Sequence, residues 1–358
     1  MGQVVGAIVA LGFLILVHEA GHLIVARWCG MKVDRFSIGF GPALFKWRSK
    51  KDTVYQVAPI LFGGFAEIRG MNLAEEPDPT DPGSYANRPV WARMAAIFAG
   101  PFTNILTAVV LAFILYSCHG FDRRLRYYEV ETVEKGWDAY GKLQPGDRII
   151  AVDDQPVYLE GPAGELRPMS PLLHDDRPAR LTVMRKGELQ APIMVQPKLD
   201  TCPTAPDTKC PRLGIRLQDG TVDLGKVELG FFGALREAVV YPWRQSKLIL
   251  GGLWQVVTRK AKLEAAGAVG ITVVIKQAIE TGWVQTFELL MMLNVYLGLF
   301  NLFPLPPLDG ARLAFLGYEL VTRRRANPKV EATVFMIGVL ILIPVLIMVT
   351  VGDCRRVF

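Results

Sequence analysis

Four long stretches of this chain contain no charged residue, and they limit the folds that the chain can adopt. A helix that crosses a membrane needs about 20 mostly apolar residues. Three of the stretches have that length, and the first reaches it if its helix continues to about Ala26. The sequence therefore predicts a polytopic α-helical membrane protein with about four transmembrane helices. The stretches are Gly2–Val17, Met94–Cys118, Leu289–Leu308 and Ala332–Gly352.

The overall composition agrees with a membrane protein. Of the 358 residues, 51% are hydrophobic and only 21% are charged, and the mean hydropathy is +0.27. A soluble enzyme usually carries more charge. The first uncharged stretch also resembles the apolar core of a signal peptide, but no small-x-small cleavage site follows it. We therefore expect this stretch to be retained as a helix.

The first predicted helix carries His18, Glu19 and His22 in the spacing H-E-x-x-H. Residues four apart lie on the same face of a helix, so the two imidazoles can bind one metal ion. In this motif the glutamate is the general base that accepts a proton from water. Ionisable residues at membrane depth are costly and usually functional. The motif predicts a zinc site; the alternative is a pair of histidines in a buried polar network.

A catalytic zinc ion normally has three protein ligands and one open position, so a third ligand is needed. Asp309 is the best candidate, because it follows the third uncharged stretch directly. Three prolines just before it interrupt the helix, and a broken helix at membrane depth can line a cavity. The alternative for Asp309 is a carboxylate at a helix end that faces the cytoplasm. His119 and His174 lie in the segment between the second and third stretches, far from the motif.

The connection between the first two predicted helices has the pattern of β-strands. Phe36–Gly41 and Val54–Ala58 alternate between apolar and small or polar residues, and Ile60–Phe65 is apolar with the glycine pair Gly63 and Gly64. Apolar strands beside a membrane suggest a sheet that dips into the interface, where protein must shield its backbone. The alternative is a small cytoplasmic hairpin.

The segment between the second and third predicted helices begins with a compact β-rich unit of about 70 residues, a normal size for a small domain. It continues with Phe231–Thr258, where bulky apolar residues recur at helical spacing. These helices either lie at the outer membrane interface or pack on the β-rich unit. Cys202 and Cys210 either form a disulfide or remain two loop thiols. The predicted strands lie within Tyr128–Val133, Leu143–Val152, Leu181–Arg185 and Ile193–Val195.

The distribution of basic residues predicts the topology. Lysines and arginines cluster in the connection from Arg27 to Arg93 and again in the loop that contains Arg323–Arg325 and Lys329. The positive-inside rule makes both of these loops cytoplasmic, so both termini and residues 119–287 face outward. The net charge of +6 is spread over membrane flanks and not in one basic stripe. The sequence therefore does not indicate nucleic-acid binding.

These features together resemble the site-2 protease family of intramembrane zinc metalloproteases. His18–His22 resembles its first motif, and Asn301–Gly310 resembles its second. Leu143–Ile149 resembles the signature turn of a PDZ domain, so the likeness is greatest to the bacterial regulator of sigma-E protease branch. Further segments similar to that family are Gly100–Asn104 in the second span, and Phe36–Gly41 and Phe62–Phe65, which resemble a membrane-associated β hairpin and edge strand.

The resemblance implies a bacterial inner-membrane peptidase with Asp309 as the third zinc ligand and Glu19 as the catalytic base. Its substrate would be a single-pass membrane protein already shortened outside by another protease, such as an anti-sigma factor or a signal-peptide remnant. Cleavage within the membrane would release a cytoplasmic piece. Asn301 and Asn104 either bind substrate or form hydrogen bonds between helices. The candidate substrate-binding residues are Asn301, Gly63, Gly64 and Asn104.

The expected domains are an N-terminal membrane half (1–118, with the β region at about 33–70), a PDZ-like domain (119–200), a linker with amphipathic helices (201–287) and a C-terminal membrane half (288–358). The stretch Lys135–Gly141 departs from the usual small-residue pattern. The PDZ-like unit therefore either grips a peptide terminus or acts as a size filter. Expected partners are the substrate and membrane lipid, and the sequence does not indicate an oligomeric state.

Two other classes of protein could use some of these features. A metal transporter could use the same ligands without hydrolysis, and it predicts further polar residues along the spans, of which few are visible. A non-catalytic PDZ membrane scaffold would not need Glu19. A Glu19→Gln variant separates these classes from a peptidase, because only the peptidase loses turnover while it keeps zinc.

Overall fold

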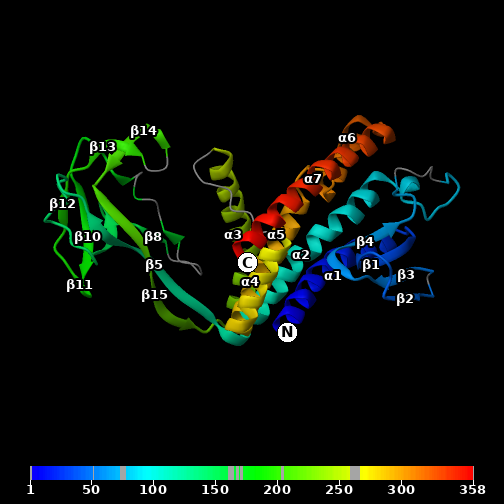
Figure 1. Cartoon of the computed structure of the whole chain (residues 1–358), viewed down its shortest axis with the longest axis horizontal. Coiled ribbons are helices and arrows are strands. Elements are labelled where there is room, and N and C mark those ends of the chain that lie inside the picture. The colour runs from blue at the N-terminus through cyan, green and yellow to red at the C-terminus, as the bar shows by residue number, and fades with distance from the viewer. Residues whose placement is uncertain are drawn as a thin grey trace. The chain divides into compact units, whose positions relative to one another are not determined.

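The computed structural model describes residues 2–50, 52–72, 78–159, 165–166, 169, 172–202, 205–258 and 267–357. The chain divides into two compact units, which are described separately (Figure 1). The first unit carries the long apolar helices and comprises Met1–Leu115, Phe231–Trp254 and Leu263–Phe358. The second unit is rich in β-strands and comprises Tyr116–Gly230 and Gln255–Lys262.

Four helices of the first unit are long and apolar enough to cross a membrane, which confirms the expected number. The third of them ends earlier than its uncharged stretch, because the prolines at 304, 306 and 307 cannot continue a helix. A non-helical segment follows, and α6 (Asp309–Thr322) begins at the aspartate. The four helices are α1 (Gly2–Trp28), α2 (Val90–His119), α5 (Trp283–Asn301) and α7 (Pro328–Val357).

The region between α1 and α2 forms a four-stranded sheet in the order β2-β3-β1-β4. Three strands match the predicted ones, and β2 was not predicted. The strand β4 pairs antiparallel with β1 and forms one edge of the sheet. It also contacts α1, so the edge strand lies beside the helix that carries the histidines (Figure 1). The strands are β1 (Val33–Phe40), β2 (Phe45–Arg48), β3 (Val54–Val57) and β4 (Ile60–Ile68).

Small residues let the helices of the first unit approach closely. A Cβ atom at Gly21 of α1 would lie 2.4 Å from the carbonyl oxygen of Ala99 in α2. A Cβ atom at Gly298 of α5 would lie 2.9 Å from the carbonyl oxygen of Pro101, also in α2. Glycine at helix contacts is the usual means of close packing in membrane proteins. The helix α2 therefore approaches both α1 and α5 closely at these two glycines.

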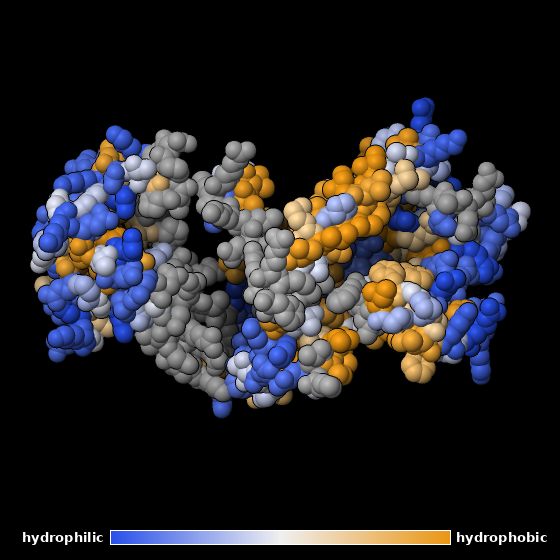
Figure 2. All heavy atoms as spheres, viewed as in Figure 1, coloured by the Kyte–Doolittle hydropathy of each residue, from blue (hydrophilic) through white to orange (hydrophobic). Residues whose placement is uncertain are grey.

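By contrast, α7 presents much of its apolar surface to the surroundings. Only 6% of its most apolar window is buried within the protein, compared with 39% for α2. Side chains such as Leu340 and Ile341 are more than half exposed, and Figure 2 shows hydrophobic surface over this helix. An exposed apolar face of this length is suited to contact with lipid tails.

Two further helices complete the first unit. The helix α3 (Phe231–Val257) confirms the helical pattern predicted for that segment. Its first residue packs edge-on against Phe113 of α2, with ring centroids 5.3 Å apart. The helix α4 (Ala268–Thr281) contacts α1, α5 and α7. The carboxylate of Asp353 in α7 accepts hydrogen bonds from the backbone amides of Gly267 and Gly270, at 2.7 and 2.8 Å, and so caps α4.

The second unit is built on a seven-stranded sheet with the path β11-β10-β6-β5-β15, to which β7 and β12 add at the sides. All four predicted strand segments contribute strands here. The long strands β5 and β15 pair with each other, and the buried core includes Val130, Ile149, Leu181 and Val195. The strands of this sheet are β5 (Phe121–Val133), β6 (Arg148–Val152), β7 (Gln155–Pro156), β10 (Ala179–Arg185), β11 (Glu188–Leu189), β12 (Ile193–Val195) and β15 (Ile215–Val227).

Two smaller strand pairs belong to the same unit. The strands β8 (Tyr158–Leu159) and β9 (Glu165–Leu166) form one pair. The other pair consists of β13 (Lys198–Cys202) and β14 (Ala205–Arg212), and a disulfide joins Cys202 to Cys210 across it. Of the two alternatives for these cysteines, the structure therefore has the disulfide.

The turn Leu143–Ile149 is held by a buried carboxylate. Asp147 is fully buried, accepts a hydrogen bond from the backbone amide of Gln144 at 2.8 Å and pairs with Arg185 at 2.7 Å. Gly146 has a φ of +90°, a left-handed conformation that favours glycine. The sequence Gly-Asp at this turn thus has a structural cause.

Candidate metal centre

The imidazoles of His18 and His22 lie one above the other on α1, as the four-residue spacing predicts. Both are buried, with 8% and 7% of their surface exposed. Their Nε2 atoms are 3.2 Å apart. Gly100 of α2 faces His22, and a Cβ atom at that position would lie 2.2 Å from His22 Nε2. The glycine in α2 is therefore what leaves room for the second histidine.

The third predicted ligand, Asp309, lies 291 positions after His18 in the chain, and the two side chains are in contact. Asp309 is the first residue of α6, where the positive end of the helix dipole favours a carboxylate. The segment before it is tightly folded, because a Cβ atom at Gly310 would lie 2.2 Å from the carbonyl oxygen of Phe303. The same segment packs closely against α7, because a Cβ atom at Gly338 of that helix would lie 2.4 Å from the carbonyl oxygen of Pro306.

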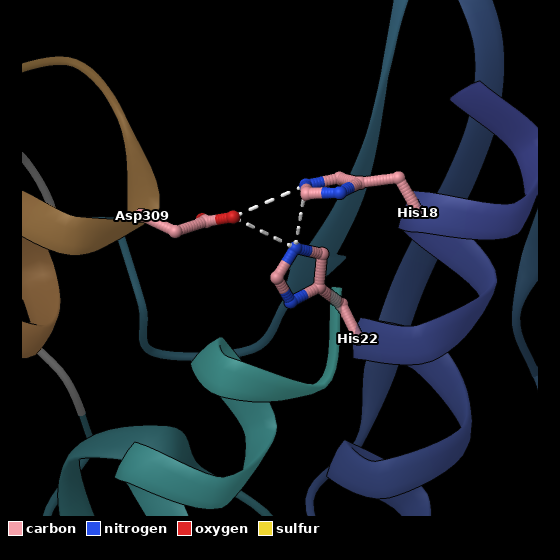
Figure 3. A group of neighbouring side chains, drawn as sticks. All are labelled: His18, His22 and Asp309. Carbon is pink, nitrogen blue, oxygen red and sulfur yellow. Dashed lines mark hydrogen bonds and ion pairs between the residues drawn. The ribbon is translucent and has the colours of Figure 1, made fainter. Parts of the chain in front are cut away.

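The three side chains converge on one point, as Figure 3 shows. Asp309 Oδ2 lies 3.1 Å from His18 Nε2 and 3.3 Å from His22 Nε2. Around a tetrahedral zinc ion with bonds of about 2.0–2.1 Å, neighbouring ligand atoms lie roughly 3.3–3.4 Å apart. The three atoms therefore already form a triangle close to one face of such a tetrahedron. The donor set of two imidazoles and one carboxylate fits zinc.

The ring nitrogen of His22 that faces away from this triangle has a defined partner. Its Nδ1 lies 2.9 Å from the carbonyl oxygen of Ala96 in α2. A carbonyl oxygen can only accept, so Nδ1 carries a proton, and in the neutral ring Nε2 is the nitrogen with the free lone pair. This arrangement is typical of metal-binding histidines. The corresponding nitrogen of His18 lies 3.0 Å from Nδ2 of Asn104, a fully buried residue of α2.

A cavity of about 310 Å³ opens beside the triangle. Glu19 lines it together with both histidines and Asp309, as the general-base role requires. Ala66 of β4 lines the cavity as well. A Cβ atom at Gly64 would lie 3.2 Å from Glu19 Cγ. The edge strand thus forms one wall of the cavity.

Of the four residues that the sequence suggests for substrate binding, some line the cavity and others do not. Asn301 and Gly64 line the cavity. Gly63 lies next to Gly64, and a Cβ atom there would lie 2.1 Å from the ring of Phe40. Asn104 is buried against His18 and is not among the described residues that line the cavity.

Sequence reasoning missed several residues of this cavity. Arg312 lines it from α6, and its guanidinium lies 5.2 Å from the ring centre of Phe335 in α7, which lines it as well. Arg312 also donates a hydrogen bond to the carbonyl oxygen of Met71 at 3.3 Å. The position of Arg312 could have indicated this, because residues three apart on a helix lie on the same face and Arg312 follows Asp309 by three. No sequence signal pointed to Phe335.

A buried ion pair fixes α6, and with it Asp309, to α2. Arg93 of α2 pairs with Glu319 of α6 at 2.6 and 3.0 Å, and both side chains are largely buried. The guanidinium of Arg93 also lies over the ring of Tyr85. Burial raises the pKa of Tyr85 to about 12, so this phenol is neutral at physiological pH.

Three features define the class of zinc peptidases with an H-E-x-x-H motif. They are a helix that carries two imidazoles and a glutamate, a carboxylate that completes the donor triangle, and an adjoining cavity. The chain belongs to peptidase family M50, because the model of "Peptidase family M50" matches residues 6–345. It is a zinc metalloprotease of that family, with His18, His22 and Asp309 as its candidate metal site.

Bacterial relatives extend over nearly the whole chain, and each carries the name "Putative zinc metalloprotease". The chain is 26% identical to a relative from Brucella suis over 367 residues, which cover 95% of this chain and 92% of the relative. It is 27% identical to one from Rickettsia conorii over 365 residues, with 100% of both chains covered. A third, from Fusobacterium nucleatum, is 28% identical over 358 residues, with 98% of each covered.

Proposed function

We propose that this metalloprotease hydrolyses peptide bonds within the transmembrane segment of single-pass membrane proteins, in the bacterial inner membrane. The observation that carries the proposal is the position of the metal site. Two of its three donors lie within Val5–Trp28, a helix long and apolar enough to cross a membrane. A site in such a helix acts at membrane depth, where soluble peptides are scarce and transmembrane segments are abundant.

The roles of the side chains follow from the geometry. Zinc held by His18, His22 and Asp309 would polarise the scissile carbonyl and lower the pKa of water to about 7. Glu19, which lines the same cavity, takes one proton from the attacking water on its carboxylate and passes it to the leaving amine nitrogen. One water is consumed, the C–N bond breaks, and the products are a new carboxylate and a new amine.

The edge strand β4 is the proposed binding surface for the substrate. A transmembrane helix hides its peptide bonds in its own hydrogen bonds, so it must unwind before hydrolysis. An extended segment can then pair with the edge of a sheet by strand addition. Gly64, Phe65 and Ala66 of β4 line the cavity, as does Asn301 at the end of α5. A peptide along β4 would therefore lie beside Glu19.

The finer assignment to the regulator of sigma-E protease branch, with a PDZ domain, is part of the proposal. The β-rich unit with its Gly146–Asp147 turn supports a PDZ-like fold. In this proposal the unit and both termini face outward, and a substrate arrives already shortened by another protease. The exposed aromatic residues Phe232, Trp243 and Trp254 of α3 support a position of that helix at the outer interface.

The test uses the purified full-length protein, zinc and a model single-pass substrate in lipid bilayers. Glu19→Gln should retain zinc and reduce hydrolysis by about 100-fold or more, since general acid–base catalysis contributes 10²–10⁴-fold. Asp309→Ala should lose both zinc and hydrolysis. A Glu19→Gln variant with wild-type turnover would overturn the catalytic role. A metal transporter or a scaffold would hydrolyse no substrate, and the substitution would leave its own function little affected.

The unwinding step has a separate test. Substrates whose transmembrane segment contains a Gly-Pro pair should be cut faster than an all-leucine segment of the same length, because the pair weakens the helix. Equal rates for the two substrates would refute the need for unwinding.

A further inference from the structure

Asn104 is a fully buried amide on α2 that contacts a proposed zinc ligand. Its Nδ2 lies 3.0 Å from His18 Nδ1. Its Oδ1 is buried as well and has no hydrogen-bond partner among the residues that the structure describes. An unsatisfied buried acceptor is destabilising and rare, so an oxygen in this state requires an explanation.

The protonation of His18 supplies the explanation. Its Nε2 faces His22 and Asp309, and it can bind a metal ion only if it carries no proton. A neutral imidazole then carries its proton on Nδ1, which needs an acceptor. For His22 that acceptor is the carbonyl oxygen of Ala96. For His18 the group at the corresponding place is the amide of Asn104, and only its oxygen can accept.

We propose that Asn104 is a positioning residue of the metal centre. Its Oδ1 accepts the Nδ1–H of His18, fixes the ring and keeps Nε2 free of a proton for the metal. A half-turn of the amide exchanges Oδ1 and Nδ2, which are nearly indistinguishable in shape. The exchange keeps one hydrogen bond to His18 and gives Oδ1 a donor, while Nδ2 moves to the buried place for which no described residue is a partner.

The packing of α1 against α2 explains why the amide is at this position. Gly100 faces His22, and Asn104, one turn later on α2, faces His18, one turn earlier on α1. The two histidines, four positions apart on α1, thus face Gly100 and Asn104, which are four positions apart on α2. Between them, Thr103 Oγ1 donates a hydrogen bond to the carbonyl oxygen of Val17 at 3.0 Å and ties the two helices together.

A second buried asparagine provides a matched control. Asn294 of α5 is also fully buried, and its Oδ1 likewise lacks a partner among the described residues. Its Nδ2, however, donates to the carbonyl oxygen of Leu290 in its own helix at 2.8 Å. An unpartnered oxygen alone is therefore not specific, and the contact with His18 distinguishes Asn104.

The first measurement is ¹⁵N NMR of the zinc-free full-length protein labelled at its four histidines. The ring-nitrogen shifts report which nitrogen carries the proton, and the His18 signals are assigned by their loss in His18→Ala. We expect His18 Nδ1 to carry a proton, whether or not Nε2 also carries one toward Asp309 in the zinc-free protein. A His18 Nδ1 without a proton in the wild-type protein would overturn the proposal, and this result needs no variant at position 104.

The second measurement is the zinc dissociation constant, from competition with a chelator. Asn104→Leu keeps the volume without an acceptor, and it should weaken zinc binding by about 10–100-fold, the usual effect of losing such a partner. Asn104→Asp keeps an acceptor and should bind zinc more tightly than Asn104→Leu. Asn294→Leu should match the wild type. Thermal unfolding of each variant reports whether it is folded.

Equal zinc affinity in Asn104→Leu and the wild type would refute the positioning role. Equal losses in Asn104→Leu and Asn294→Leu would refute it too, because the loss would then come from packing. The inference rests on the proposed role of His18 as a ligand, and His18→Ala tests that role separately. If zinc affinity survives in His18→Ala, the proposed metal centre fails; if it fails to survive there and is unchanged in Asn104→Leu, only the inference fails.

Discussion

The helices α2 and α7 are alike in sequence character and opposite in their use. Both have 30 residues, both contain one internal proline, and both qualify as membrane spans. Yet 39% of the most apolar window of α2 is buried within the protein, compared with 6% for α7. The difference lies in a few small and polar residues. Gly100, Thr103 and Asn104 of α2 face α1, whereas the middle of α7 consists of large aliphatic residues that face outward.

The comparison teaches that apolar length predicts a span but not its neighbours. Polar and small residues decide which face of a membrane helix packs against protein, because close backbone approach and hydrogen bonds replace the hydrophobic driving force inside a bilayer. On α7 the same rule holds at isolated positions, namely Gly338, which packs against Pro306, and Asp353, which caps α4.

The largest expected difference between the two helices is at glycine. Gly100→Ala in α2 places a methyl group 2.2 Å from His22 Nε2. Overpacking should cost about 1–3 kcal/mol, and displacement of the imidazole should weaken zinc binding by about 10-fold or more. Gly352→Ala in α7 has no atom within 4 Å of the new methyl group and should change neither property. Chelator competition and thermal unfolding measure both, and similar effects at the two sites would remove the contrast.

The largest expected loss of stability concerns the ion pair between α2 and α6. Arg93→Ala leaves Glu319 buried without its bidentate partner. Removing one member of a buried pair costs about 3–5 kcal/mol. The matched control is Arg48→Ala, whose partner Asp52 is 76% exposed. That variant should cost less than about 1 kcal/mol. Thermal unfolding in detergent checks this, and a small loss for Arg93→Ala would show that the pair does not hold α6 in place.

Apolar truncation sharpens the same comparison. Ile97 of α2 is fully buried, whereas Leu340 of α7 is 64% exposed. Ile97→Ala removes core contacts and should reduce stability by about 2–5 kcal/mol. Leu340→Ala removes contacts with lipid and should stay within about 0.5 kcal/mol. The free energy of unfolding in bilayers is the measurement. A large loss for Leu340→Ala would instead indicate that another protein surface covers α7.

The smallest effect is expected at the polar anchor of α7. Asp353→Ala removes the acceptor for the amides of Gly267 and Gly270. Loss of a helix cap costs about 0.5–2 kcal/mol. Hydrogen exchange of the first turn of α4 should increase, while exchange in α2 should not. Unchanged protection of α4 would show that the cap does not stabilise this helix.

Local patterns in the sequence predicted much of this structure. The uncharged stretches predicted the four long helices. Alternation predicted two strands of the first sheet, and an apolar run with a glycine pair predicted the third. Four-residue spacing predicted that His18 and His22 share a face, because helix geometry alone determines it. The strand β2 was missed although its four residues, Phe-Lys-Trp-Arg, alternate apolar with charged side chains. So short an alternation is a weak signal.

The candidate metal donors and the kinds of secondary structure were thus readable from the chain itself, because they depend on residue type and short spacing. Only the tertiary structure decided which neighbour each donor has. It brought Asp309 to within 3.1 Å of His18, placed Gly100 and Asn104 against the two imidazoles and added Phe335 to the cavity. These contacts depend on how close two backbones approach across hundreds of residues, and no local pattern encodes that distance.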